Sequence, residues 1–126
     1  MEVGQKFTVE SMVSPETTAK AAGSGGLLVY GTPYMIALME KAACQCVQKD
    51  LEEGQSTVGT MLNIQHTSAT PVGMEVRAEA VLTAVEGRKL SFTVTAYDEK
   101  GEIGHGEHER FIIQEEKFLA KTYDKL

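Results

Sequence analysis

Residues 32–54 have the sequence TPYMIALMEKAACQCVQKDLEEG, which combines helix signals at both ends with an apolar stripe between them. Thr32 suits an N-cap, Pro33 suits the first helical turn, and Gly54 follows the far end. We therefore predict one long helix from Pro33 to Leu51 with a single buried face. The apolar stripe recurs at spacings of three and four, at Met35, Met39, Ala42, Ala43 and Cys46.

Downstream of this helix the apolar period changes to two and stays there as far as Ile113. Such alternation predicts half-buried strands, at residues 56–67, 75–85, 89–98 and 102–113. The tripeptide Glu86-Gly87-Arg88 is typical of a tight antiparallel hairpin. We expect these four strands to form an antiparallel meander.

The remaining segments complete an α+β domain. Residues 5–13 alternate weakly and predict a first strand, residues 19–26 are rich in Ala, Gly and Ser and predict a mobile loop, and residues 115–123 predict a short terminal helix. The long helix must bury its stripe against one face of a curved antiparallel sheet. This is the element order of a hotdog fold, and 126 residues suit a single domain spanning 1–126.

Composition narrows the classes of partner. Eighteen acidic residues against twelve basic ones give a net charge of −6, which argues against a nucleic-acid partner. The N-terminus lacks the apolar core of a secretory signal, and no apolar stretch is long enough to span a membrane. We expect a cytoplasmic protein without membrane contact. Cys44 and Cys46 point about 200° apart on a helix, so we predict reduced thiols rather than a disulfide or a chelating pair.

Four polar residues lie beside apolar or glycine-rich sequence, and each has an ordinary structural explanation as well as a catalytic one. A threonine before proline usually caps a helix, and a carboxylate beside an apolar stripe is usually solvated or paired. A histidine at a strand end is as often structural as catalytic. Taken alone, the four leave both explanations open; they are Thr32, Glu40, His66 and Arg110.

Taken together, several motifs resemble the hotdog thioesterases typified by fluoroacetyl-CoA thioesterase, over nearly the whole chain after Val3. The matching segments are residues 35–43 with Leu38-Met39-Glu40, 59–60, 66–71 (HTSATP), 85–88 (VEGR), 102–110 (EIGHGEHER) and 116–118 (EKF). The resemblance implies a homodimeric thioesterase that hydrolyses a short-chain acyl-CoA without a metal or redox cofactor.

The resemblance also assigns roles to individual residues. Thr32, Glu40 and His66 match the catalytic threonine, glutamate and histidine of that family. Gly59 would present its backbone N–H to the thioester oxygen, and Arg110 would lie close to the site.

Two versions of the chemistry remain open. In the first, Thr32 attacks the carbonyl, His66 accepts its proton and Glu40 orients the imidazole. In the second, Glu40 or His66 activates water and Thr32 only positions it. Eight residues of straight helix separate Thr32 from Glu40 by about 12 Å, so either Thr32 lies in a folded-back loop or the site combines groups from two subunits.

The chain departs from the family pattern before Thr32, and two other functions are alternatives to thioester hydrolysis. Where the family has phenylalanines before the catalytic threonine, residues 23–30 are GSGGLLVY, which predicts an open entrance and no particular preference for fluoroacetate. His105 and His108 have opposite parity on a strand, so we expect no metal site, whereas His108 and Arg110 share a face. The alternative functions are a non-catalytic acyl-CoA-binding domain and a hydratase; the Asp and His pair expected of a hydratase is not found around the long helix.

Overall fold

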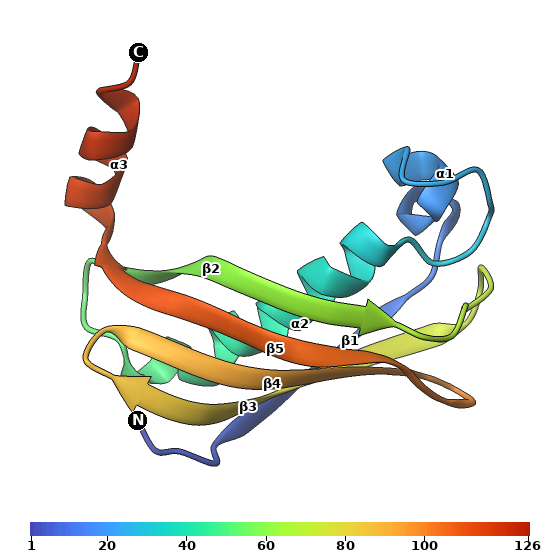
Figure 1. Cartoon of the computed structure of the whole chain (residues 1–126), viewed down its shortest axis with the longest axis horizontal. Coiled ribbons are helices and arrows are strands. Elements are labelled where there is room, and N and C mark those ends of the chain that lie inside the picture. The colour runs from blue at the N-terminus through green and yellow to red at the C-terminus, as the bar shows by residue number, and fades with distance from the viewer.

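The computed structural model describes residues 1–126 and consists of a five-stranded antiparallel sheet that curves around one long helix (Figure 1). The α+β prediction, with a long helix against a curved antiparallel sheet, is confirmed. The elements are β1 (Lys6–Met12), a 3-10 turn (Pro15–Thr17), α1 (Ala19–Ala22), α2 (Thr32–Val47), a second 3-10 turn (Gln48–Asp50), β2 (Gln55–His66), β3 (Glu75–Glu86), β4 (Lys89–Asp98), β5 (Gly101–Gln114) and α3 (Glu115–Tyr123).

The strand order is β1-β3-β4-β5-β2, so the predicted four-strand meander is wrong for β2. Only β3, β4 and β5 follow one another as neighbours, while β2 pairs with β5 at the far edge. The connection from β2 to β3 spans residues 67–74 and contains Pro71, which is too long for a tight hairpin and lets β2 leave its successor. Consequently β2 is an edge strand with one side of its backbone unpaired.

Helix α2 begins differently from the prediction. Its N-cap is Gly31, Thr32 is the first helical residue, and the Thr32 side chain makes no capping hydrogen bond. The predicted N-cap role of Thr32 is therefore wrong, because the extended backbone of Gly31 ends the preceding segment one residue earlier. At the other end the α-helix stops at Val47 and tightens into a 3-10 turn that ends at Asp50, one residue before the predicted end at Leu51.

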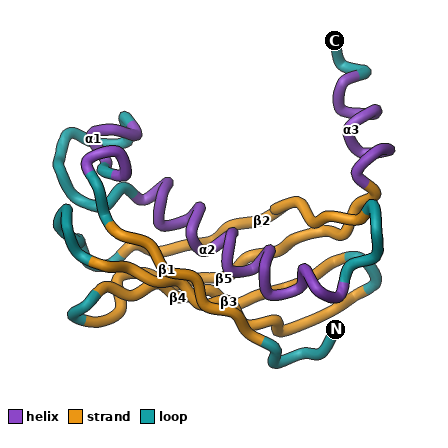
Figure 2. Tube along the Cα trace, turned by 180° about the vertical axis from the view of Figure 1, so that it is seen from behind, coloured by secondary structure: helices purple, strands orange, loops and turns teal.

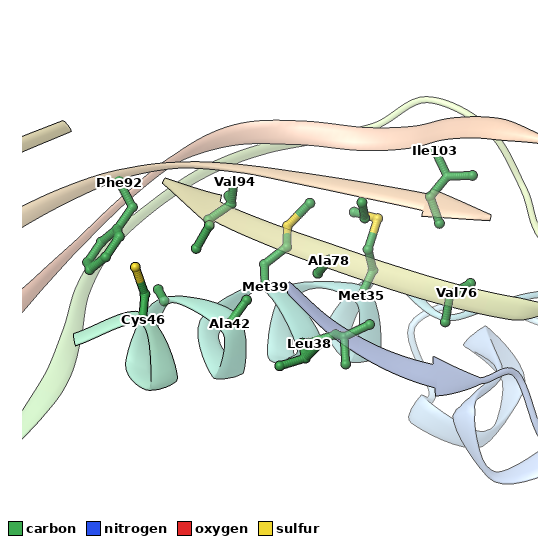
Figure 3. Close-up of a cluster of buried hydrophobic side chains, with 14 of the residues drawn as sticks. Met35, Leu38, Met39, Ala42, Cys46, Val76, Ala78, Phe92, Val94 and Ile103 are labelled. Atoms are coloured by element: carbon green, nitrogen blue, oxygen red, sulfur yellow. The ribbon is translucent and has the colours of Figure 1, made fainter. Parts of the chain in front are cut away.

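The core lies between α2 and the concave face of the sheet (Figure 3). Met35, Met39 and Ala42 point from the helix toward Val94 and Ile103 on the strands (Figure 3). Small side chains at the crossing let helix and sheet approach closely, which tightens packing across the whole interface. The small residues that are fully buried there are Ala42, Ala43, Ala78, Ala80 and Ala96.

The predicted mobile loop at residues 19–26 is wrong for its first half, which forms the single turn α1. The Thr18 hydroxyl accepts a hydrogen bond from the Ala21 backbone N–H at 3.1 Å, and Gly23 ends the turn with a φ of 73°. Backbone pairing of Thr18 with Tyr30 then closes the segment at its base. What remains open to solvent is the short stretch before α2, where Leu27 and Leu28 are exposed.

The terminal helix α3 has the predicted bounds and contains no buried residue. It leaves the end of β5 and projects beyond the β2 edge, and α1 projects on the same side at the other end of the sheet (Figures 1 and 2). None of the helices combines the length and apolar character that crossing a membrane requires. Cys44 and Cys46 are both free thiols, as predicted, and Cys46 is buried.

Candidate active site

The first part of the site forms where the start of α2 meets the end of β2. Thr32 Oγ1 lies 2.7 Å from His66 Nδ1, a distance typical of a short hydrogen bond. The hydroxyl is free for this contact because Gly31, not Thr32, caps the helix. Gly31 suits this close approach, since a Cβ at that position would lie 3.0 Å from the Thr18 backbone and the Tyr34 ring. The Thr32–His66 pair opens into a pocket of about 270 Å³ that also touches Tyr30.

The electrostatics of His66 suit a base. Burial lowers its pKa from the ordinary value of 6.5, and the backbone of Ser68 offsets part of that shift. The imidazole is therefore neutral at pH 7, and with its hydrogen on Nε2 the Nδ1 lone pair can accept the Thr32 proton. Nε2 is enclosed by its own chain and has no hydrogen-bond partner. This pairing can deprotonate a threonine nucleophile at neutral pH.

A second cluster forms halfway along α2. Glu40 Oε2 lies 3.4 Å from Arg110 Nη1, and the Arg110 side chain is almost fully buried. Both groups crowd Gly59 on β2: a Cβ there would lie 2.7 Å from Glu40 Oε2 and 3.3 Å from Arg110 Nη1. A glycine at this position leaves room for the carboxylate, which a larger side chain would push away from the strand backbone. The structure thus brings Glu40, Gly59 and Arg110 together.

The two clusters remain apart within one chain. Thr32 is the first residue of α2 and Glu40 lies eight residues later in the same continuous helix, about 12 Å further along its axis. The folded-back loop considered from the sequence is therefore wrong, because Thr32 is helical. The arrangement that could unite Thr32, His66 and Glu40 is one built from two subunits.

The two histidines of β5, His105 and His108, lie on opposite faces of the strand, as predicted. His105 is exposed and contacts Glu102 at 2.8 Å, whereas His108 is fully buried. No group of three or more histidine, cysteine or acidic side chains is arranged to hold a metal ion. His108 instead joins Arg110 in a buried network, with Nε2 at 3.2 Å from Arg110 Nη1.

Sequence reasoning missed one member of that network. Thr57 on β2 accepts hydrogen bonds from Arg110 through both its hydroxyl and its backbone carbonyl. Its only signal in the sequence is its spacing of two from Gly59, which puts both residues on the same face of the strand. A threonine in a predicted strand does not by itself indicate a functional residue, because threonine favours strands in general.

Comparisons with known proteins agree along the whole chain. The family model for fluoroacetyl-CoA-specific thioesterases matches residues 13–116. The fluoroacetyl-CoA thioesterase of Streptantibioticus cattleyicolor is 40% identical over 131 residues, covering 99% of this chain and 94% of that protein.

Solved structures give the same result. A mutant of the fluoroacetyl-CoA thioesterase FlK in complex with acetyl-CoA has a TM-score of 0.95 at 39% identity, covering 99% of this chain and 98% of the other. A hot-dog-like protein from Thermanaerovibrio acidaminovorans has a TM-score of 0.90 at 19% identity, covering 100% of this chain and 93% of the other, which shows the fold.

Proposed function

This chain belongs to the fluoroacetyl-CoA-specific thioesterase family and is an acyl-CoA thioesterase, and from that premise we propose that it hydrolyses a short-chain acyl-CoA to the free acid and CoA with Thr32, Glu40 and His66. The observation that carries the proposal is the 2.7 Å contact between Thr32 Oγ1 and His66 Nδ1. A protein that only binds acyl-CoA needs no such pairing of a hydroxyl with a neutral, half-buried imidazole.

We propose the covalent version of the chemistry. Thr32 Oγ1 attacks the thioester carbonyl while His66 Nδ1 takes the hydroxyl proton, and the oxyanion is held by the backbone N–H of the partner's Gly59, in the dimer proposed below. Collapse of this intermediate breaks the carbon–sulfur bond, and His66 returns the proton to the departing thiolate of CoA. Water then cleaves the acyl-threonine ester, with a base taking its proton, to release the acid.

We further propose that the reactive groups come from two subunits of a homodimer. If β2 pairs antiparallel with its own copy about a two-fold axis between Leu62 and Asn63, then His66 stands opposite Gly59 of the partner subunit. Glu40 packs against Gly59 within each chain, so the same pairing would bring the partner's Glu40 toward Thr32. Two such sites would form, one on each side of the axis.

Two features of the fold support this pairing. The edge strand β2 is twelve residues long and leaves one side of its backbone unpaired, which is a ready template for another strand. The nine-residue helix α3 buries no side chain and projects past the same edge (Figure 1). A helix this short is marginal in water by itself, so a partner surface beyond β2 would stabilise it.

The surroundings of His66 indicate where the partner's Glu40 would act. Nε2 of His66 is enclosed by its own chain, so a carboxylate from another subunit would reach the Thr32 side of the imidazole more easily. There it would face the acyl group and could take the proton of the attacking water in the second step. This assigns Glu40 to deacylation rather than to orienting the imidazole.

A complementation experiment tests both the residues and the dimer. Thr32→Ala is expected to abolish thiol release from acetyl-CoA, and Glu40→Gln is expected to release about one equivalent of thiol per site and then to turn over only at a small residual rate. Co-expressed in one cell, the two variants form mixed dimers that contain one intact site, so about a quarter of the wild-type activity should return under random mixing. The control is a mixture of Thr32→Ala with His66→Ala, which places both defects on the same side of the site and should restore nothing.

Several results would overturn the proposal. A fully active monomer in ultracentrifugation would remove the two-subunit site, as would mixed dimers without activity. Survival of activity in Thr32→Ala alone would favour direct attack by water. The location in the cytoplasm, the single domain over residues 1–126 and the independence from metals or redox cofactors are also proposals; undiminished activity after dialysis against EDTA is the expected result for the metal.

A further inference from the structure

Arg110 is the centre of a buried polar network between β2, β5 and α2. Its Nε donates to Thr57 Oγ1 at 2.8 Å and its Nη2 donates to the Thr57 carbonyl at 2.9 Å. The remaining terminal nitrogen, Nη1, faces Glu40 Oε2 at 3.4 Å and His108 Nε2 at 3.2 Å. All three guanidinium nitrogens therefore have partners, and the plane of the group is fixed.

The hydrogen bonds of His108 determine its tautomer. Nδ1 lies 2.8 Å from the Met61 carbonyl, which can only accept, so the ring hydrogen is on Nδ1. Nε2 is left with a lone pair and accepts from Arg110. The ring is fully buried and stacks on Phe92 with centroids 6.1 Å apart, so it has no freedom to turn. His108 thus acts as a fixed acceptor for the guanidinium.

A β-bulge brings the Met61 carbonyl into this network. The pairing of β2 with β5 shifts between Gly59 and Met61, so Thr60 is an extra residue in the strand. Bulges of this kind redirect neighbouring backbone groups out of the regular ladder. The irregularity in β2 therefore lies directly beside Gly59 and its crowded contact with Glu40.

We propose that Thr57 and His108 are positioning residues of the thioesterase reaction, which fix Arg110 so that its guanidinium holds the Glu40 carboxylate over Gly59. The inference rests on the proposed catalytic role of Glu40. Glu40 needs such support, since its side chain is 36% exposed and its contact with Arg110 is long at 3.4 Å. A guanidinium free to rotate would leave the carboxylate without a defined direction.

The network also makes the position of Glu40 sensitive to acid. The charged groups that face the His108 ring are Arg110, Glu40 and Glu109, and burial is the main reason why the pKa of His108 is lowered. Protonation would put a hydrogen on Nε2, directly against the Nη1 donor of Arg110, and would add a second positive charge. Acidification would therefore release Arg110 from its acceptor and loosen Glu40.

Variants of Thr57 separate positioning from packing. Thr57→Val keeps the shape and the backbone carbonyl but removes the hydroxyl acceptor, and we expect kcat to fall about tenfold with KM nearly unchanged. Thr57→Ser restores the acceptor and should recover most of kcat. In a Glu40→Gln background the Thr57→Val change should cost little more, because the group that it positions has already lost its function.

Variants of His108 test the acceptor. His108→Gln can still donate to Met61 and accept from Arg110, so it should retain kcat near pH 8 and lose activity less steeply below pH 6 than the wild type. His108→Leu should resemble Thr57→Val. The matched control is His105→Gln on the opposite face of β5, which should leave the pH profile unchanged.

The inference fails if Thr57→Val costs the same factor with Glu40 and with Gln at position 40, because the loss would then be purely structural. It also fails if His108→Leu keeps the wild-type kcat and pH profile. A fully active Glu40→Gln variant is a different outcome: it removes the catalytic role of Glu40 itself, and with it the proposed function of that residue.

Discussion

Adding one methyl group at Gly59 tests whether the close approach of β2 to the Glu40 carboxylate matters for catalysis. A Cβ at this position would lie 2.7 Å from Glu40 Oε2, 3.2 Å from a ring carbon of His108 and 3.3 Å from Arg110 Nη1. Gly59 is not among the glycines with positive φ, so its backbone accepts alanine without strain. The effect of Gly59→Ala is therefore steric and falls mainly on the carboxylate.

The distances set the expected size of the effect. To reach an ordinary van der Waals separation, Oε2 must retreat by about 0.7 Å, and its long contact with Arg110 must change with it. The Glu40 carboxylate lies at the end of a flexible side chain, so the fold tolerates the change. We expect the free energy of unfolding to fall by about 1 kcal/mol at most. A misplacement approaching 1 Å in an active site costs up to about 100-fold, so kcat/KM should fall by roughly 10- to 100-fold.

The assay is free-thiol release from acetyl-CoA, with thermal unfolding as the stability control. Glu40→Ala and the double variant Gly59→Ala with Glu40→Ala complete a cycle. Removing the carboxylate makes room for the methyl group, so the double variant should be no worse than Glu40→Ala alone. Wild-type kcat/KM in Gly59→Ala refutes the reasoning, and so does an equal loss with and without Glu40, which would assign the effect to the Gly59 backbone instead.

Three other predictions follow from burial and from the entrance. Burial lowers the pKa of both His66 and His108 from 6.5. Below pH 6.5 the unfolded chain therefore binds more protons at these two residues than the folded chain does. Their contribution to thermal stability should be constant above pH 6.5 and should fall as the pH drops through the lowered pKa values of the folded protein. Burial also raises the pKa of Cys46, so a thiol reagent should modify Cys44 in the native protein and Cys46 only after unfolding. Because residues 23–26 are Gly, Ser, Gly and Gly, the entrance before Thr32 is expected to be open, and the specificity constants for fluoroacetyl-CoA and acetyl-CoA should be similar. A large ratio in favour of fluoroacetyl-CoA contradicts this.

Much of the fold follows from local pattern. Alternation within the segment from Glu75 to Asp98 predicts both strands and their hairpin, because the buried apolar residues recur at every second position. These residues are Val76, Ala78, Ala80 and Leu82 on one strand and Leu90, Phe92, Val94 and Ala96 on the other. The position of β2 does not follow, since alternation states which face is buried and says nothing about which strand lies alongside.

The geometry of the candidate site could be predicted from the sequence only in part, because it too depends on how distant segments pack together. Thr32 precedes a proline and carries the signature of a helix cap, yet Gly31 takes that position and releases the hydroxyl to His66. The bulge at Thr60 has no sequence signal of its own, and it lies beside Met61, whose carbonyl accepts a hydrogen bond from His108. Both features depend on contacts between elements that are far apart in the sequence, and the residue types at these positions do not predict such contacts.

If Thr32 and Glu40 act together as proposed, their placement on one straight helix makes catalysis depend on dimer assembly. A helix of sixteen residues is stiff, so no rearrangement within one chain can close about 12 Å between its first turn and its middle without unfolding the core that it anchors. A second subunit could bring its own Glu40 to Thr32 without unfolding the core, because the edge of β2 is already unpaired. A site divided between Gly59 and His66 on β2 would therefore be completed by pairing two copies, and separation of the subunits would remove the carboxylate from the hydroxyl without disturbing either cluster.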